Sequence, residues 1–216
     1  MTAYFKAVRP DGTDFHTGTV QWAPPDGHEG EWIVRHPTAT KIGDHPSEYL
    51  SVSALATDCK GMKWPCRLLT VEAVGDVIKP MPDFLPNKRA GVAFRVTGEL
   101  PAHEALGPQG VYVSALLERA CHLTLDEERA LAPAWDAAKP AAGNVALFAA
   151  WDATRDAARD AVRATAKIAA SGGAWNAACG LITRDLITTE DYDTLTRPWR
   201  EVIGPIHPDD PDMRQP

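Results

Sequence analysis

The spacing of hydrophobic and polar positions changes along the chain near residue 112. Before this point, apolar residues alternate with polar ones in short runs that proline and glycine interrupt, a pattern typical of β-strands. After it, alanine dominates and apolar residues recur at helical spacing. The pattern predicts a mostly-β part over residues 1–112, a helical part over 113–204 and a mobile polar tail over 205–216.

Six segments of the β part have the composition of strands. Turn sequences separate them, such as Arg9–Thr13, in which proline fixes φ and Asp-Gly reverses the chain. The segment Cys66–Ile78 has the strongest strand pattern and is predicted to be central. The predicted strands form a small mixed or mainly antiparallel sheet and comprise Ala3–Val8, Phe15–Trp22, Trp32–Pro37, Tyr49–Leu55, Cys66–Ile78 and Val92–Leu100.

The helical part is predicted to hold four to five helices. Thr124 and Glu127 have the spacing of a capping box, in which each side chain bonds to the backbone N–H of the other residue. Pro133 is expected to kink or split the helix that follows, because proline removes a hydrogen bond from a helix interior.

The remaining helices are predicted from their starts and stops. A long helix is expected from Val145 to Ala170, with Ser171–Gly173 ending it. Thr188 and Thr189 are candidate helix caps, and Pro198 is expected in the first turn of a short last helix.

Together these patterns predict an α+β fold. The sheet of the N-terminal half is expected to pack against the helices of the C-terminal half, because neither half alone offers a thick core. We expect the two parts to form one compact unit.

The segment Trp151–Ala166 reads WDATRDAARDAVRATA. Each aspartate precedes an arginine by three residues, so ion pairs can form along one side of a helix. Because the two signs alternate, the pattern indicates a solvated face rather than a nucleic-acid-binding row. Alanines form a smooth strip on the other side, and tryptophans open similar segments. We therefore predict packing or self-association through Trp135, Trp151, Ala153, Ala157, Ala161 and Trp175.

Composition limits the class of protein further. The 216 residues carry a net charge of −7, which argues against broad binding of nucleic-acid backbones. No apolar run approaches the roughly 20 residues that a bilayer requires, and the first residues contain no apolar signal region. We expect a protein of the cytoplasm, or of the host cytoplasm if a phage encodes it, with reduced cysteines. Cys121 and Cys179 lie in apolar helical segments and are predicted to be buried.

The sequence contains no motif for metal, phosphate or nucleophilic chemistry. Cys59 and Cys66 are too far apart for the C-x₂₋₄-C pairs of structural zinc. Segments of the form G-x-S-x-G, G-x-x-x-x-G-K-[ST] and G-x-G-x-x-G are absent. We predict neither a metal nor a cofactor.

One arrangement in the β part places Arg9 or His16 early, Ser51 and Ser53 on a later strand, and Glu99 after them. This layout resembles that of ADP-ribosyltransferases. The resemblance implies a nicotinamide dinucleotide in a cleft between two small sheets, with these residues around it. The sequence departs from the family where Ser-Thr-Ser and Glu-x-Glu would stand. A second interpretation places both serines on the solvated face of an amphipathic strand.

Further motifs extend over more of the chain, namely Tyr4–Lys6, the strand Tyr49–Leu55, the segment Val71–Val77 and the pair Glu99-Leu100. Together they resemble a small domain of unknown function from bacteriophage and prophage proteins, although the aromatic-cysteine signature of its middle strand is missing. The segment from Trp151 onward is similar to the alanine-rich tails of actinobacterial and actinophage hypothetical proteins.

These observations favour an accessory protein of phage type, without catalytic machinery, that acts by binding a host or phage protein. One alternative is an ADP-ribosyltransferase-like or other nucleotide-binding domain in the β half. Another is a structural module that forms a homodimer through its alanine strip. Neither a membrane nor a nucleic acid is expected as partner.

Overall fold

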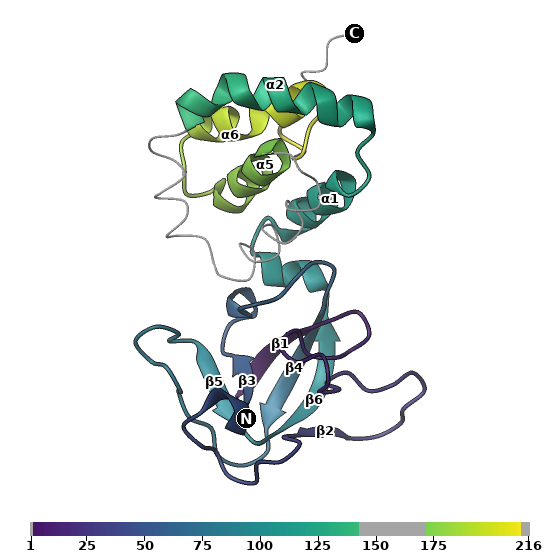
Figure 1. Ribbon diagram of the computed structural model, residues 1–216, viewed down its shortest axis with the longest axis vertical. Coiled ribbons are helices and arrows are strands. Elements are labelled where there is room, and N and C mark those ends of the chain that lie inside the picture. The colour runs from purple at the N-terminus through teal and green to yellow at the C-terminus, as the bar shows by residue number, and fades with distance from the viewer. Residues whose placement is uncertain (1, 143–171, 213–216) are drawn as a thin grey trace. The chain divides into compact units, whose positions relative to one another are not determined.

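The computed structural model of the chain describes residues 2–142 and 172–212. The chain divides into two compact units, residues 1–105 and 106–216. The N-terminal unit holds a six-stranded antiparallel sheet, and four helices are described in the C-terminal unit (Figure 1). The predicted α+β class is therefore confirmed.

The N-terminal unit is built on a sheet in which all neighbouring strands are antiparallel, in the order β2-β6-β4-β1-β3-β5. Three 3₁₀ turns accompany it, η1 (Pro46–Glu48), η2 (Ala56–Asp58) and η3 (Ala102–Leu106). The strands are β1 (Ala3–Val8), β2 (Trp32–Arg35), β3 (Leu50–Ser53), β4 (Arg67–Ala73), β5 (Lys88–Gly91) and β6 (Ala93–Leu100).

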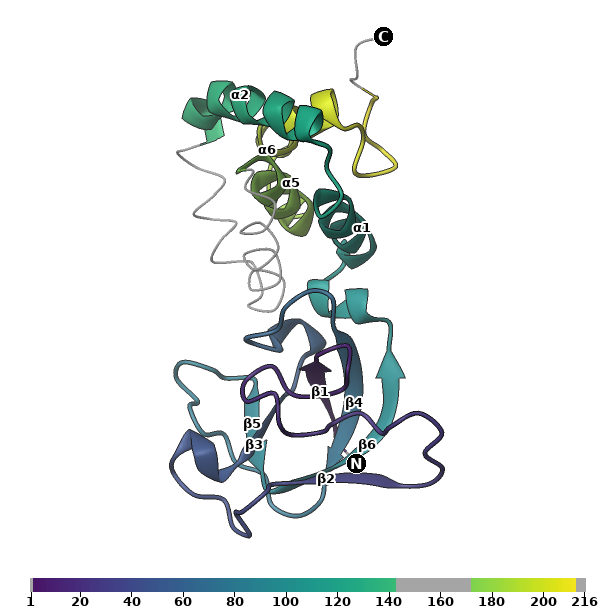
Figure 2. The ribbon, with the colours of Figure 1, turned by 45° about the vertical axis from the view of Figure 1, so that its right-hand side comes forward.

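Strands β5 and β6 follow each other with only Val92 between them, although β5 is at one end of the strand order and β6 lies next to β2 at the other end. The chain therefore bends at Val92 and carries one strand from beside β3 to a place between β2 and β4 (Figure 2). One nearly continuous segment therefore pairs with β3 in its first part and with β2 and β4 in its second.

The apolar face of the sheet forms the core of the N-terminal unit. Trp22, from the segment before β2, lies on this face with its ring centroid 5.9 Å from that of Phe94. The buried members of the core are Val8, Trp22, Ala23, Val34, Leu50, Val52, Leu69, Val71 and Phe94.

The segment Phe15–Trp22, predicted as a strand, is instead a loop with one isolated bridge. The reason is Asp14, whose carboxylate accepts hydrogen bonds from Thr17 N and Thr17 Oγ1, both at 2.6 Å, and from Val20 N at 3.0 Å. Such local side-chain bonds occupy the backbone groups that a strand would use. The loop is thereby fixed in the shape that brings Trp22 to the core.

The predicted strand Cys66–Ile78 is also shorter than expected. Strand β4 ends at Ala73, and the chain then turns through Gly75, whose φ of +102° favours glycine. Ile78 returns beside β5, where Ile78 and Ala90 exchange two backbone hydrogen bonds of 3.0 Å.

Lys6 places an amine next to the apolar core. Its Nζ donates to the carbonyl of Ser51 at 3.0 Å and lies 4.8 Å from the centroid of the Trp22 ring. Burial lowers the pKa of Lys6, while Cys59 and Asp14 act in the opposite direction. Through these contacts Lys6 connects β1 with β3 and with the loop that carries Trp22.

The described helices of the C-terminal unit are α1 (Gly110–Ala120), α2 (Leu125–Ala142), α5 (Gly172–Thr183) and α6 (Thr189–Val202). Helix α5 contacts the other three, and α2 also contacts α6. The predicted helix from Val145 to Ala170 lies outside the described residues. Buried apolar residues of this unit include Val113, Leu116, Leu117, Leu131, Leu181, Leu195 and Trp199.

Helix α2 continues through Pro133, which was expected to kink or split it. Residues on both sides of Pro133 are held by neighbouring helices. Leu131 is fully buried beside Gly173 of α5, and Trp135 packs on Leu195 of α6. These contacts keep the helix continuous despite the missing hydrogen bond.

The predicted helix starts are confirmed at two positions. Thr124 and Glu127 form the capping box, with Glu127 accepting from Thr124 N at 2.8 Å. Thr188 caps α6 by accepting from Asp191 N at 3.1 Å. Because α6 begins directly after this cap, Pro198 lies inside the helix and not in its first turn, as had been expected.

The hydrogen bonds of Asp14 predict a pH dependence. Burial alone raises the pKa of Asp14, but the hydrogen bonds from Thr17 and Val20 outweigh it and lower the pKa to about 2. The carboxylate therefore stabilises the fold above its ordinary pKa of about 3.9, and this contribution is lost as the pH falls through about 2.

We expect Asp14→Asn to lower the free energy of unfolding of the N-terminal unit by about 1–3 kcal/mol at neutral pH. The difference from the wild type should shrink as the pH falls from about 4 towards 2. Amide hydrogen exchange in β1, β4 and β6 measures this difference in the free energy of unfolding for the N-terminal unit alone. A difference that stays constant over this range would contradict the role given to the carboxylate.

Candidate functional site

A proline-rich loop over residues 79–87 joins the turn after β4 to β5. Hydrogen bonds fix it internally, with Leu85 N donating to Met81 O at 2.8 Å and Lys88 N donating to Leu85 O at 3.0 Å. Arg89 Nη1 donates to the carbonyl of Pro86 at 2.7 Å. The loop is thus ordered within itself.

The same loop is tied to the rest of the N-terminal unit through Asn87. Its carbonyl accepts from Ala54 N at 2.8 Å, and its side-chain amide donates to Asp58. Ala54 and Asp58, which follow β3 in the chain, therefore hold the base of the loop in place.

Phe84 projects from this anchored loop with 85% of its surface exposed. Two other large apolar side chains with substantial exposure in this unit border β5: Ile78 (41%), which pairs with Ala90, and Leu55 (39%), which follows Ala54. We call the exposed side chain of Phe84 on this loop the Phe84 surface. The strand and helix patterns of the sequence do not single out Phe84. The signal available was an aromatic residue among prolines, where no core is expected.

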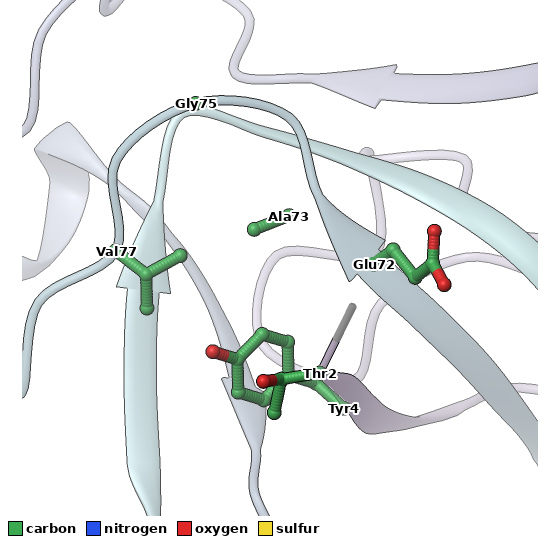
Figure 3. A pocket seen from close by; sticks show the side chains of 6 residues that line it. All are labelled: Thr2, Tyr4, Glu72, Ala73, Gly75 and Val77. Carbon is green, nitrogen blue, oxygen red and sulfur yellow. The ribbon is translucent and has the colours of Figure 1, made fainter.

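The described residues also form a shallow cavity of about 220 Å³ at the start of β1 and the end of β4. Figure 3 shows the ring of Tyr4 beside Ala73, with its hydroxyl towards Val77. The carboxylate of Glu72 points away from that ring and lies 3.8 Å from Arg95 Nη1. The cavity therefore offers an aromatic wall and the hydroxyl groups of Tyr4 and Thr2, without a converging acid and base.

The residues proposed for an ADP-ribosyltransferase-like site lie apart. Ser51 and Ser53 are on β3, whereas Glu99 is on β6, with β1 and β4 between these strands. Three strand spacings of about 4.8 Å separate them along the sheet.

The strand register also places these residues on opposite faces. Ser53 lies opposite Phe5, which lies opposite Thr70, whereas Glu99 lies opposite Leu69, the next residue of β4. The structure does not bring the serines and Glu99 to one site.

The other candidate residues have local partners or face solvent. Glu99 forms an ion pair with Arg67 at 2.6 Å. The guanidinium of Arg9 covers Gly18, and His16 is exposed in the loop that follows β1.

The tryptophans and alanines predicted to act in packing or self-association are described only in part. Trp135 is half-buried against Leu195, together with Ile187. Trp175 lies on α5 and is half-buried. Outside the described residues lie Trp151, Ala153, Ala157 and Ala161.

A polar network holds residues 206–210 on the helices of the C-terminal unit. Arg184 donates to Asp209 at 2.8 Å and contacts His207 Nε2 at 3.0 Å. Tyr192 donates to Asp210 at 3.0 Å, and its pKa is raised by burial and then by that carboxylate. The network orders part of the predicted tail.

Arg200 is the most deeply buried charged residue that the structure describes in this unit, with 1% of its surface exposed. It forms an ion pair with Asp193 and stacks 5.8 Å from the Tyr192 ring centroid. Its Nε has no hydrogen-bond partner among the residues the structure describes. Through these contacts, Arg200 connects its own turn of α6 with the turn that carries Tyr192 and Asp193.

Three of the four thiols are buried and one is not. Burial raises the pKa of Cys59 to about 11 and those of Cys66 and Cys179 to about 12. Cys121, predicted to be buried, is exposed because it caps the C-terminal end of α1. Within the described ranges, no three or more histidine, cysteine, aspartate or glutamate residues are grouped to hold a metal ion.

Comparison with protein-family models, curated proteins and solved structures found no match to the chain. Among the helices in residues 2–142 and 172–212, none is long and apolar enough to cross a bilayer.

The burial of the thiols predicts a selective reaction. Under native conditions near pH 8, iodoacetamide should add one carbamidomethyl group per chain, at Cys121, because the thiolate is the reactive form. The other three cysteines should react only after unfolding. Peptide mapping by mass spectrometry locates the adduct, and native alkylation of Cys59 or Cys66 at the rate of Cys121 would contradict their burial.

Proposed function

We propose that this protein is a non-catalytic binding protein and that the Phe84 surface inserts into an apolar pocket of another protein. The observation that carries the proposal is the 85% exposure of Phe84 on a loop that hydrogen bonds hold at its base. Water is a poor environment for such a side chain, and burial in a partner stabilises the complex.

The energetics support an anchor role for Phe84. Full burial of a phenylalanine side chain contributes roughly 1.5–3 kcal/mol. The loop is already ordered by the bonds of Leu85, Lys88 and Asn87, so binding loses little chain entropy. A few well-packed side chains supply most of the binding energy of an interface, and a large apolar ring that fills a pocket is suited to be one of them.

The resemblance of the β half to phage and prophage domains supports a host or phage protein as the partner. The exposed apolar group supports a partner with a concave apolar site rather than a charged surface. Both features can be tested by changing Phe84 and measuring its contact with the partner.

We expect Phe84→Ala to lower affinity for the partner by at least tenfold, about 1.4 kcal/mol. Replacement of Phe84 by the photoreactive p-benzoylphenylalanine should give a discrete cross-linked adduct in actinobacterial lysate, identified by mass spectrometry. Binding of that identified protein to the wild type and to Phe84→Ala then measures the loss.

Leu186 supplies the matched control, because it is also exposed, by 65%, but lies in the C-terminal unit. Leu186→Ala should bind as the wild type does, and the photoreactive residue at position 186 should not give the same adduct. Equal affinity of Phe84→Ala and wild type would refute the proposal, provided that both unfold at the same temperature.

A further inference from the structure

Strand β2 leaves one side of the sheet open. It pairs with β6 only and stands at one end of the strand order. At the other end, β5 is bordered by Ile78 through the bridge with Ala90. An unpaired strand edge is a template for another strand.

The backbone groups on the open edge follow from the register of β2 and β6. His36 N donates to Val92 O at 2.8 Å, so these residues form a hydrogen-bonded pair. Bonded pairs alternate along antiparallel strands, so Val34 and Trp32 also bond to β6. The N–H and C=O groups of Ile33 and Arg35 therefore face away from the sheet, and no described residue bonds to them.

The side chains of this edge alternate in the same way. Val34 is buried and Trp32 packs on the core, so Ile33 and Arg35 lie on the other face of the strand. Glu31, one step before the strand, forms an ion pair with Arg95. Arg35 is exposed and takes part in no ion pair among the described residues.

We propose that β2 pairs antiparallel with β2 of a second copy of the chain, about a two-fold axis at Ile33. In this register, Ile33 faces Ile33 of the second copy, with two backbone hydrogen bonds between them. Glu31 then faces Arg35 of the second copy, and the symmetry repeats this pair at the other end. Opposite charges directly across two strands are favourable.

The neighbouring registers are less favourable. A centre at Val34 places Pro37, which has no N–H, opposite Glu31. A centre at Arg35 places the two arginines opposite each other, and like charges in that position are destabilising. Of the centres at Ile33, Val34 and Arg35, the one at Ile33 alone places each Glu31 opposite an Arg35 of the other copy.

The test is a charge exchange, measured by sedimentation equilibrium over a dilution series of the full chain. Wild type should rise from the monomer mass of 23.4 kDa towards twice that value. Glu31→Arg and Arg35→Glu should each weaken the dimer by at least tenfold, because each places like charges in both cross-strand pairs. An equimolar mixture of the two variants should form a heterodimer, in which all four charges are complementary again.

The mixture also shows that each variant is folded, which matters for Glu31→Arg because it removes the partner of Arg95. Arg35→Glu breaks no described ion pair. A wild type that stays monomeric, single variants that dimerise as the wild type does, or a mixture that stays monomeric would each overturn the proposal. The dimer does not depend on the Phe84 surface, so Phe84→Ala should leave it unchanged.

Discussion

The contact between Trp22 and the apolar face of the sheet is the constraint on which the N-terminal unit depends. Trp22 comes from a loop, so the core is closed by a segment that has no ladder of its own to hold it. Local hydrogen bonds fix this loop instead. Thr17 and Val20 donate to Asp14, and Trp22 N donates to Gly12 O at 2.9 Å. A φ of +85° at Gly12 allows that approach at a position where other residues are strained.

This constraint explains which parts of the fold the sequence predicts. The capping box at Thr124 and the cap at Thr188 depend on residues near in sequence, and cap spacing identifies them. The alternation within β1 is likewise visible in its own residues, although its partner strands lie far along the chain. The segment Phe15–Trp22 has the alternation of a strand, yet the side chain of Asp14 takes its backbone groups. Local pattern does not reveal such competition.

The remaining differences have tertiary causes. The continuity of α2 through Pro133 depends on Leu131 and Trp135, whose partners are on other helices. The sequence does not predict the candidate site, because the exposure of Phe84 depends on how the whole unit folds around its loop. Serines and a glutamate at suggestive positions proved to lie on opposite faces of the sheet, a result that only the register of four strands determines.

The Phe84 surface and the open edge of β2 differ in the kind of interaction that they can make. The Phe84 surface is apolar and projects from an ordered loop, so shape and desolvation govern what it binds. The edge of β2 offers directional backbone groups between two charges of opposite sign, so register governs what it binds. One chain could use both, because residues 31–35 and the loop of residues 79–87 are separate segments and do not compete for the same groups.

The position of β1 also determines when the unit can be completed during synthesis. β1 is the first strand made, yet it lies between β4 and β3 in the interior of the sheet. β3 emerges from the ribosome first and offers it one register pair, whereas β4 offers six, including Lys6 with Leu69. Such long-range pairing is slow to form. The nascent chain must carry β1 unpaired on one side until residues 67–73 have left the ribosome, and β2 waits longer still, for residues 93–96.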